Sequence, residues 1–562
     1  MNDRWSRSAL PLAIVVLLPA VLIVVRLVVN PILTSDDAFF LDAGFAWMTE
    51  RRLALPLWGQ GLGHATFLAS YPPVMPLISS IDAWALVVTG TLLGAKITDV
   101  ALIVATSWLF WNSLNFIGRP WLRAAVTLAV LLDPLVSTDY ASLRPEALLI
   151  PLVFALFMAS HRIIERERCC TVAAAVSGAG LALTHWQFAP TVFYAGVALL
   201  AAARVGRIGW RPAIAYWAAT SVAYGTYVLY IVLDSTRRAI FVAQLSAAGG
   251  SSPFVQRIRL FVGTMFAGNV ESGSIASLLL LLAVVIAIAQ VRIRAFRSGD
   301  QTTWSAPYTL GFLIVSVLPA LSLPYVGPRI VPLFLVAAWV VVRAAAGPAA
   351  PLLAIAAPIV AVLNVAGDLA LRAGYNHETG PSLWLQKSWL WLALSVLVWA
   401  ASRRQAPVLA RNAVLAGALA IGLATSLTLM TPAGVLMNGS NIKSMQTALA
   451  VVPPNVPVLC DSTTAYIPLR IGHPNRQIFT TFPLFYFRGM FDTLFSGMNP
   501  AVILVSDTVR VQIRNVQPAG RQLEDQLRQH FALSTSFEVG GGRTWVYVRT
   551  PPQTVRAAVS RR

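Results

Sequence analysis

The stretch Thr34-Ser35-Asp36-Asp37-Ala38-Phe39-Phe40 places two adjacent carboxylates directly after an apolar run, residues 10–29. Ionisable side chains at membrane depth are costly to desolvate, so they are usually functional or paired. Ser-Asp-Asp ahead of a further apolar run is also a good helix N-cap. The local sequence therefore leaves two interpretations open, a pair of reactive carboxylates or a helix cap.

The composition predicts a polytopic membrane protein. Of the 562 residues, 57% are hydrophobic and only 12% are charged, whereas soluble domains carry about 25% charged residues. The net charge of +19 would suggest nucleic-acid binding in a soluble protein. In a membrane protein it indicates arginine clusters in cytoplasmic loops, so no nucleic-acid partner is expected. Cys169, Cys170 and Cys460 form neither a disulfide framework nor a metal-ligand cluster with histidine.

The apolar segments predict about thirteen membrane-spanning helices, with the N-terminus inside and the C-terminus therefore outside. Arg4 and Arg7 precede the first helix, which lacks a cleavage site and is interpreted as a retained anchor. Two of the helices flank Thr184–Phe188, and another ends at Arg292–Arg297. The remaining helices are expected at residues 92–114, 124–136, 147–159, 212–233, 307–323, 330–342, 352–371, 383–400 and 408–430.

The chain is expected to form two domains, a transmembrane domain at 1–430 and an extracytoplasmic α/β domain at 431–562. The first external loop, 31–91, begins as an amphipathic segment and contains the rigid run Tyr71–Pro76. In the second domain, 456–461, 501–507 and 544–548 read as strands, and 521–531 reads as an amphipathic helix. Asp461 and Asp507 end two of these strands, either as site residues or as ordinary loop residues.

Polar residues gather on the predicted outer face, where arginine suits a phosphate and a carboxylate can accept a proton from a hydroxyl. Simpler interpretations stand beside this one. Arg144 and Glu146 can pair and cap the fourth helix with Pro145, His185 can have a local partner, and Arg329 can be an interfacial anchor. Arg237 and Arg238 break the positive-inside pattern and so need a partner. The outer-face set is Asp36, Asp37, His64, Tyr71, Asp139, Arg144, Glu146, His185, Arg237, Arg238 and Arg329.

Several of these motifs together resemble the GT-C superfamily. They are the acidic pair after the first helix, Tyr71-Pro72-Pro73 with Pro76-Leu77, the Arg144-Pro145-Glu146 turn, and Pro328-Arg329 ahead of Pro332. The bacterial branch related to protein O-mannosyltransferases and lipid A aminoarabinose transferases is the most similar. The resemblance covers about residues 1–430. It implies a mainly α, GT-C-like bundle of transmembrane helices, and the C-terminal domain carries no motif of the family.

The resemblance also implies an activity. Such a protein is a glycosyltransferase of the bacterial cytoplasmic membrane that uses a polyprenyl-phosphate-linked sugar as donor. It transfers the sugar with inversion, on the outer face, to a hydroxyl of a glycan, glycolipid or protein acceptor. The base on that hydroxyl is then Asp36 or Asp37, because the family commonly has Asp-Glu where this chain has Asp-Asp.

The other roles carry over residue by residue. Arg144 and Glu146 match a second acidic position that orients donor or acceptor, and Tyr71 belongs to the substrate-binding loop. Arg329 matches an arginine that holds the lipid phosphate, although Ile330 replaces the usual tyrosine. His185 stands after Leu183-Thr184, where the family often has a lysine, and a neutral histidine is a weaker phosphate ligand. Arg237 and Arg238 are further phosphate candidates.

Three alternatives remain. Paired carboxylates suit a divalent metal, but no third carboxylate stands in an obvious ligand position, so no metal or other cofactor is expected. A transporter or lipid flippase would also carry charges within the membrane, yet the span lengths show no inverted repeat and the charges gather on one face. The third alternative is a non-catalytic relative whose external domain binds a partner.

Overall fold

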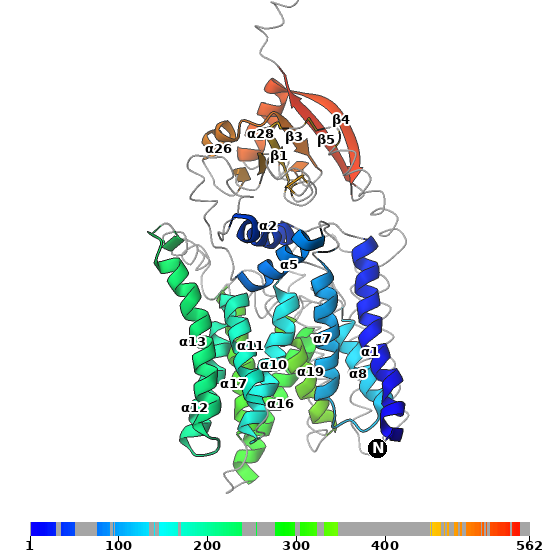
Figure 1. Ribbon diagram of the computed structural model, residues 1–562, viewed down its shortest axis with the longest axis vertical. Helices are drawn as coiled ribbons and strands as arrows, with labels where there is room; N and C mark the ends of the chain where they lie inside the picture. Colours follow the sequence, from blue (N-terminus) through cyan, green and yellow to red (C-terminus); the bar gives the residue numbers. More distant parts are fainter. Residues whose placement is uncertain are drawn as a thin grey trace, which may run out of the picture. The chain divides into compact units, whose positions relative to one another are not determined.

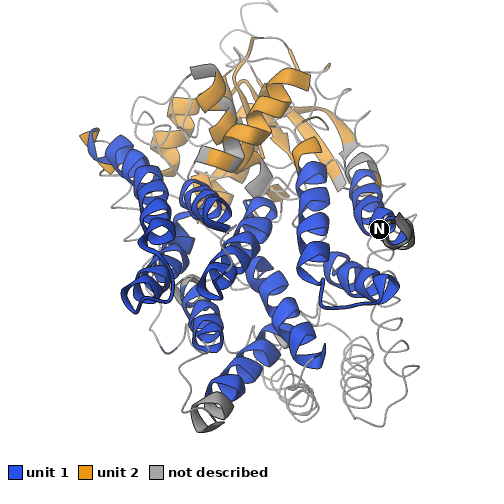
Figure 2. Cartoon of the chain, turned by 60° about the horizontal axis from the view of Figure 1, so that its bottom comes forward, with its two compact units in different colours: residues 1–24, 99–233, 242–429 blue, residues 25–98, 234–241, 430–562 orange. Residues whose placement is uncertain are grey.

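The computed structural model describes two compact units. The helical unit comprises Met1–Val24, Asp99–Leu233 and Val242–Leu429, and the sheet unit comprises Val25–Thr98, Asp234–Phe241 and Met430–Arg562 (Figures 1 and 2). The described residues are 2–29, 35–50, 76–89, 96–133, 145–166, 170–235, 276–297, 304–322, 331–346, 455–461, 477–481, 490–506, 518–539 and 542–550, with isolated residues between these ranges.

The helical unit is built from helices whose bounds follow the apolar segments closely. It contains most of α1 (Asn2–Val29) and α7 (Ile97–Ser113), followed by α8 (Pro120–Leu131), α10 (Glu146–Ile164), α11 (Thr171–Thr184), η2 (Trp186–Phe188), α12 (Ala189–Arg204), α13 (Trp210–Val232), α16 (Ala276–Arg297), α17 (Ser305–Ser322), η3 (Val331–Leu333) and α19 (Phe334–Ala346). The helices expected at 352–371, 383–400 and 408–430 lie outside the described residues, so the number of spans stays a prediction.

Several predicted bounds differ from the observed ones by a few residues, and two cases illustrate the shift. The helix expected at 124–136 is α8, which begins at Pro120 and ends at Leu131. Proline suits the first turn of a helix, since its missing N–H would be unsatisfied there. The helix expected at 330–342 begins as the short 3-10 turn η3 and continues as α19 to Ala346.

Close approach of backbones holds α11, α12 and α13 together. A Cβ atom on Gly178 would lie 2.7 Å from the Tyr216 ring, and one on Gly196 would lie 2.7 Å from Trp217. The Tyr216 hydroxyl donates to the Val192 carbonyl at 2.7 Å, and Trp217 Nε1 donates to the Gly196 carbonyl at 3.2 Å. Small residues at helix interfaces allow such contacts, which are typical of helices packed in a membrane.

Within the described residues, two helical stretches are long and apolar enough to cross a membrane, judged by length and composition alone. They are Glu146–Ile164 and Trp186–Arg204. The outward faces of the helices are also apolar, with Val172, Val176, Phe193, Ile214 and Val222 each at least 60% exposed.

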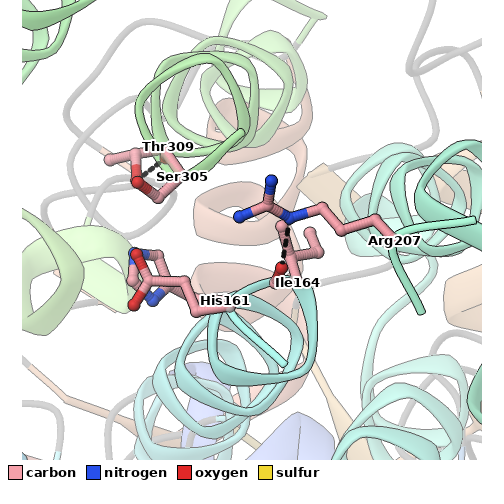
Figure 3. A network of polar contacts seen from close by, with 6 residues as sticks. His161, Ile164, Arg207, Ser305 and Thr309 are labelled. Carbon is pink, nitrogen blue, oxygen red and sulfur yellow. Dashed lines mark hydrogen bonds and ion pairs between the residues drawn. The ribbon is translucent and has the colours of Figure 1, made fainter. Parts of the chain in front are cut away.

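A polar network lies near the C-terminal end of α10 (Figure 3). Arg207 Nε donates to the Ile164 carbonyl at 2.8 Å, and the Thr309 hydroxyl donates to the Ser305 carbonyl at 2.7 Å. His161 is buried beside them, with its Nε2 3.8 Å from Glu165 Oε1. The Arg207 bond ties α10 to the segment after α12.

The C-terminal part of the sheet unit is a five-stranded mixed sheet in the order β2-β1-β3-β5-β4. The strands β1 (Val458–Cys460), β2 (Ile478–Thr480) and β3 (Val502–Val505) are parallel, and β5 (Gly542–Arg549) is antiparallel to both β3 and β4 (Phe531–Val539). The predicted strands correspond to β1, β3 and β5. The first two are continuous apolar runs, as is typical of buried parallel strands.

Two helices cover one face of this sheet. They are α26 (Phe491–Met498), which the sequence analysis did not predict, and α28 (Pro518–His530), which corresponds to the helix expected at 521–531. Leu494, Phe495 and Leu527 from these helices pack with the strands in a single core. The helix α26 ends at Asn499, whose backbone is left-handed with φ 41°, a conformation that asparagine tolerates at helix ends.

The same unit contains two helices of the segment predicted to be the first external loop, α2 (Ser35–Glu50) and α5 (Pro76–Thr89), which pack against each other. Ala38, Leu41 and Ala46 of α2 are fully buried, as is Ala83 of α5. The segment predicted to be amphipathic is therefore a helix with a buried face of small and apolar side chains.

Candidate functional site

The acidic pair lies at the start of α2. This helix begins at Ser35, so Asp36 and Asp37 occupy its first turn. The exposed N–H groups at a helix N-terminus favour negative charge, which stabilises carboxylates at this position. The structure therefore places the pair on a regular helix, and its backbone position agrees with the helix-start interpretation. A base held on a helix is positioned more precisely than one on a free loop.

A buried ion pair fixes the middle of the same helix. Asp42 of α2 and Arg470, which follows β1 in the chain, are both buried, and Arg470 Nε lies 2.8 Å from Asp42 Oδ1. The Tyr466 hydroxyl donates to the same oxygen at 3.2 Å. Burial, followed by the charge of Asp42, raises the pKa of Tyr466 well above its usual range. The phenol therefore stays protonated and remains a donor at neutral pH.

Two of the predicted substrate-binding residues, Glu146 and His185, are buried at helix ends in the helical unit. Glu146 is the first residue of α10, follows Pro145 at the N-cap, and is buried. His185 is also buried and caps η2, since its Nδ1 accepts a hydrogen bond from the Gln187 backbone N–H at 3.3 Å. This contact with the Gln187 backbone is a local partner of the kind that the simpler interpretation of His185 expects.

The outer-loop arginines have a local carboxylate beside them. The Arg237 backbone N–H donates to Asp234 Oδ1 at 3.0 Å, and its Nε lies 3.6 Å from Asp234 Oδ2. Arg238 is exposed, and its backbone N–H donates to the Asp234 carbonyl at 3.0 Å. Asp234 supplies the partner that the charge pattern requires for Arg237.

The candidate residues are divided between the units. Asp36, Asp37, Arg237 and Arg238 belong to the sheet unit, whereas Glu146 and His185 belong to the helical unit. His64, Tyr71, Asp139, Arg144 and Arg329 lie outside the described residues.

The sequence analysis missed the residues that hold α2. Asp42 falls in the segment predicted to be amphipathic, but it is buried between buried Leu41 and Ala43. A carboxylate in the middle of an apolar stripe is a signal that a partner exists. The Tyr466 hydroxyl and Asp42 are 424 residues apart in the chain. A contact over such a separation leaves no local sequence pattern, so the sequence does not indicate Tyr466 or Arg470 as partners of Asp42.

A second buried polar group also escaped the sequence analysis. Asp82 of α5 accepts a hydrogen bond from the Thr98 hydroxyl at 2.7 Å, and Lys96 is 1% exposed. Lys96 falls inside the helix expected at 92–114, where it was overlooked among apolar neighbours. The helix α7 instead starts at Ile97, after this lysine.

The carboxyl ends of the parallel strands carry the predicted Asp461. It is buried, and the Ser506 hydroxyl at the end of β3 donates to its Oδ2. This bond joins the ends of β1 and β3, so it accounts for Asp461 structurally. Asp507 lies outside the described residues.

A cavity of about 550 Å³ lies beyond the end of β3. Val505 and Phe531 line it with Arg510, Arg521 and Arg528, and Glu524 is the one carboxylate in the lining. Arg510 stacks on Trp545 at 3.5 Å, and Arg528 pairs with Glu524. This lining suits an anionic group better than a cationic one. Among the described residues, no group of three or more His, Cys, Asp or Glu side chains could hold a metal ion.

Comparisons with known proteins identify the fold. No family model matches the chain, and no curated protein matches it. The crystal structure of ArnT from Cupriavidus metallidurans bound to undecaprenyl phosphate is similar, with a TM-score of 0.54, 11% identity, and coverage of 98% of this chain and 100% of that one. The apo structure of that ArnT has a TM-score of 0.51 and 13% identity over 96% and 99% of the two chains. The chain therefore shares the fold of that ArnT along almost its whole length.

Proposed function

We propose that this protein transfers a sugar from a polyprenyl-phosphate-linked donor to an acceptor hydroxyl, with inversion. The observation that carries the proposal is the likeness in fold to ArnT, which has been crystallised with undecaprenyl phosphate. The acidic pair at the start of α2 supplies a base in the first external loop, as the GT-C resemblance implies.

For this reaction the protein needs to supply mainly the positions of the reacting groups and the charges around them. A lipid phosphate is a good leaving group, so the protein must orient the acceptor, accept its proton and stabilise the departing phosphate. We assign the proton to Asp36 or Asp37. The carboxylate attracts the acceptor proton while the hydroxyl oxygen attacks the anomeric carbon, and the bond to the phosphate oxygen breaks. Arg144, Arg237, Arg238 and Arg329 are the candidate cations for the phosphate, and Tyr71, Glu146 and His185 complete the substrate contacts.

We place the reaction on the outer face of the bacterial cytoplasmic membrane. The N-terminus is then cytoplasmic, and residues 431–562 are extracytoplasmic. Apolar side chains that are exposed on α11, α12 and α13, among them Val172 and Val222, support a lipid environment for these helices, since large exposed apolar surfaces mark such contacts. The acceptor is a glycan, glycolipid or protein of the envelope.

The test compares envelope glycans by mass spectrometry in strains that carry the intact gene, a deletion, or the deletion complemented with Asp36→Asn, Asp37→Asn. Loss of a general base costs about 10²–10⁴-fold in rate. We therefore expect one glycan to lose a single sugar on deletion and the double variant not to restore it. The two single variants identify the base, since only one of them should lose activity to this extent.

A matched control is Asp525→Asn, which neutralises an exposed carboxylate of α28. This variant should restore the product fully, at equal amounts of inserted protein. Full restoration by the double variant as well would refute the proposed mechanism and favour the flippase or the non-catalytic alternative.

A further inference from the structure

The contact between Asp42, Arg470 and Tyr466 joins the helix of the acidic pair to the C-terminal sheet. All three side chains are almost fully buried. Arg470 Nε and the Tyr466 hydroxyl approach one carboxylate oxygen, Asp42 Oδ1, at 2.8 and 3.2 Å. Tyr466 and Arg470 both belong to the segment between β1 and β2. The carboxylate of the external loop is therefore held by residues that come from a distant part of the chain.

A contact of this kind defines position more than it adds stability. Two buried charges lose their hydration, and their attraction only roughly compensates for the loss, so a well-packed apolar pair is often equally stable. An isolated buried charge is strongly unfavourable, however, so each charge requires the other close by. Ala38, Leu41 and Ala46 of α2 are also buried, and apolar contacts of small side chains are not directional.

Because Asp42 and the acidic pair lie on one helix, a contact that fixes Asp42 also fixes the position of the pair. Asp36 and Asp37 precede Asp42 by five to six residues on one uninterrupted helix, which is about 7–9 Å along the axis. A helix of this length moves as one body, so a shift or rotation at Asp42 also displaces its first turn. A base must stay within hydrogen-bond reach of the acceptor hydroxyl, and a misplacement of about 1 Å can cost 10²-fold in rate.

We infer that Arg470 and Tyr466 are positioning residues for the transfer reaction, and that they act by holding Asp42 so that the acidic pair at the start of α2 meets the acceptor. This inference rests on the proposed function. It gives the C-terminal domain a role in the chemical step itself, in addition to any contact with the acceptor.

The decisive variant replaces both charges together, Asp42→Leu with Arg470→Met. This double variant removes the contact together with both of its charges, so the melting temperature should stay close to that of the unchanged protein. Two measurements report on position. The first is product formation per inserted protein, which should fall at least tenfold, while the Kd for undecaprenyl phosphate, used as the probe for the donor site, stays within about twofold. The second is amide hydrogen exchange of α2 residues 38–46, which should become faster while exchange in α28 does not change.

Two further variants test whether a loss of product formation only reflects a loss of stability. Tyr466→Phe removes only the hydrogen bond to Asp42 and should lower product formation severalfold with no change in melting temperature. Asp525→Asn neutralises an exposed carboxylate on α28 and should change neither measurement. A purely structural role predicts that product formation follows the melting temperature in every variant. Full product formation in the double variant, or unchanged α2 exchange, would overturn the inference.

The same experiment separates this inference from the proposed function. If Asp36→Asn, Asp37→Asn keeps full activity, the proposed base is wrong and the positioning role falls with it, whatever the exchange data show. If that variant is inactive but Asp42→Leu, Arg470→Met is fully active, the proposed function stands and only the positioning role is refuted.

Discussion

Two kinds of buried polar contact, one taken from each unit, work in different ways. In the helical unit, the neutral donors of Tyr216 and Trp339 reach the main-chain carbonyls of Val192 and Ser113 on neighbouring helices. In the sheet unit, a charged pair, Asp42 and Arg470, joins segments far apart in the chain. A neutral donor can be removed at modest cost, whereas a buried charge cannot lose its partner alone. The first arrangement packs helices, and the second defines one position.

The largest effect on stability in this comparison is expected in the apolar core of the sheet unit. Leu494→Ala removes a side chain of α26 that is 4% exposed and leaves a cavity, which costs about 2–5 kcal/mol. The matched control is Leu533→Ala on β4, where the side chain is 55% exposed and the cost is within about 1 kcal/mol. Thermal unfolding of the purified protein measures both, and equal shifts would refute this core.

A smaller effect is expected where helices approach closely in the helical unit. In Gly178→Ala the new Cβ atom would lie 2.7 Å from Tyr216, and such overpacking costs about 1–3 kcal/mol. On α13, Gly225 has open space around it, so Gly225→Ala should stabilise the helix by about 0.5–1 kcal/mol. A loss of stability in Gly178→Ala together with a gain of stability in Gly225→Ala would confirm the close approach of α11 and α13. A gain of stability in Gly178→Ala would contradict it.

The neutral donors should give a smaller effect again. Tyr216→Phe keeps the ring in place and removes the 2.7 Å hydrogen bond to the Val192 carbonyl, which costs about 0.5–1.5 kcal/mol. Thermal unfolding of the variant beside the unchanged protein measures this loss. A loss as large as that of Leu494→Ala would mean that the helical unit also depends on single polar contacts, which would remove the contrast between the units.

The smallest effect concerns chemical reactivity and leaves stability unchanged. Burial, reinforced by the charge of Asp461, raises the pKa of the Cys460 thiol above its usual range. Since the thiolate is the nucleophile, raising the pH from 7 to 9 should leave native Cys460 unlabelled by a maleimide. Unfolded protein should react at both pH values and faster at pH 9. Labelling is measured by peptide mass spectrometry, and rapid native labelling would contradict a closed sheet core.

Much of the helical architecture was predictable from the sequence because apolar segments, basic loops and proline positions mark helix bounds locally. The turn at Thr184–Phe188 falls between α11 and α12 as expected, and the strands β1 and β3 follow from continuous apolar runs. The sequence analysis missed β4, since its start at Phe531 was assigned to the preceding helix. Short strands such as β2, with three residues, give too little periodicity to detect.

The candidate site was predictable only in part. Asp36 and Asp37 attract notice because two carboxylates follow an apolar helix. Arg470 and Tyr466 could not be found in the same way, because a contact between chain-distant residues leaves no local pattern. Lys96 was missed for a different reason, since one charged residue lowers the average hydropathy of an apolar segment only slightly and the segment still reads as a helix across the membrane.

The link between Asp42 and the segment after β1 also sets an order of events during synthesis. The two sides of the Tyr466–Asp42 contact are 424 residues apart, and ribosomes add about 5–20 residues per second, so Asp42 waits on the order of 20–85 s for its partners. During this interval α2 carries a carboxylate that has nothing from the C-terminal domain to hold it. A nascent chain therefore completes the surroundings of its acidic pair only when the last part of the protein has been made. Any truncation before Arg470 would leave Asp42 permanently without this partner.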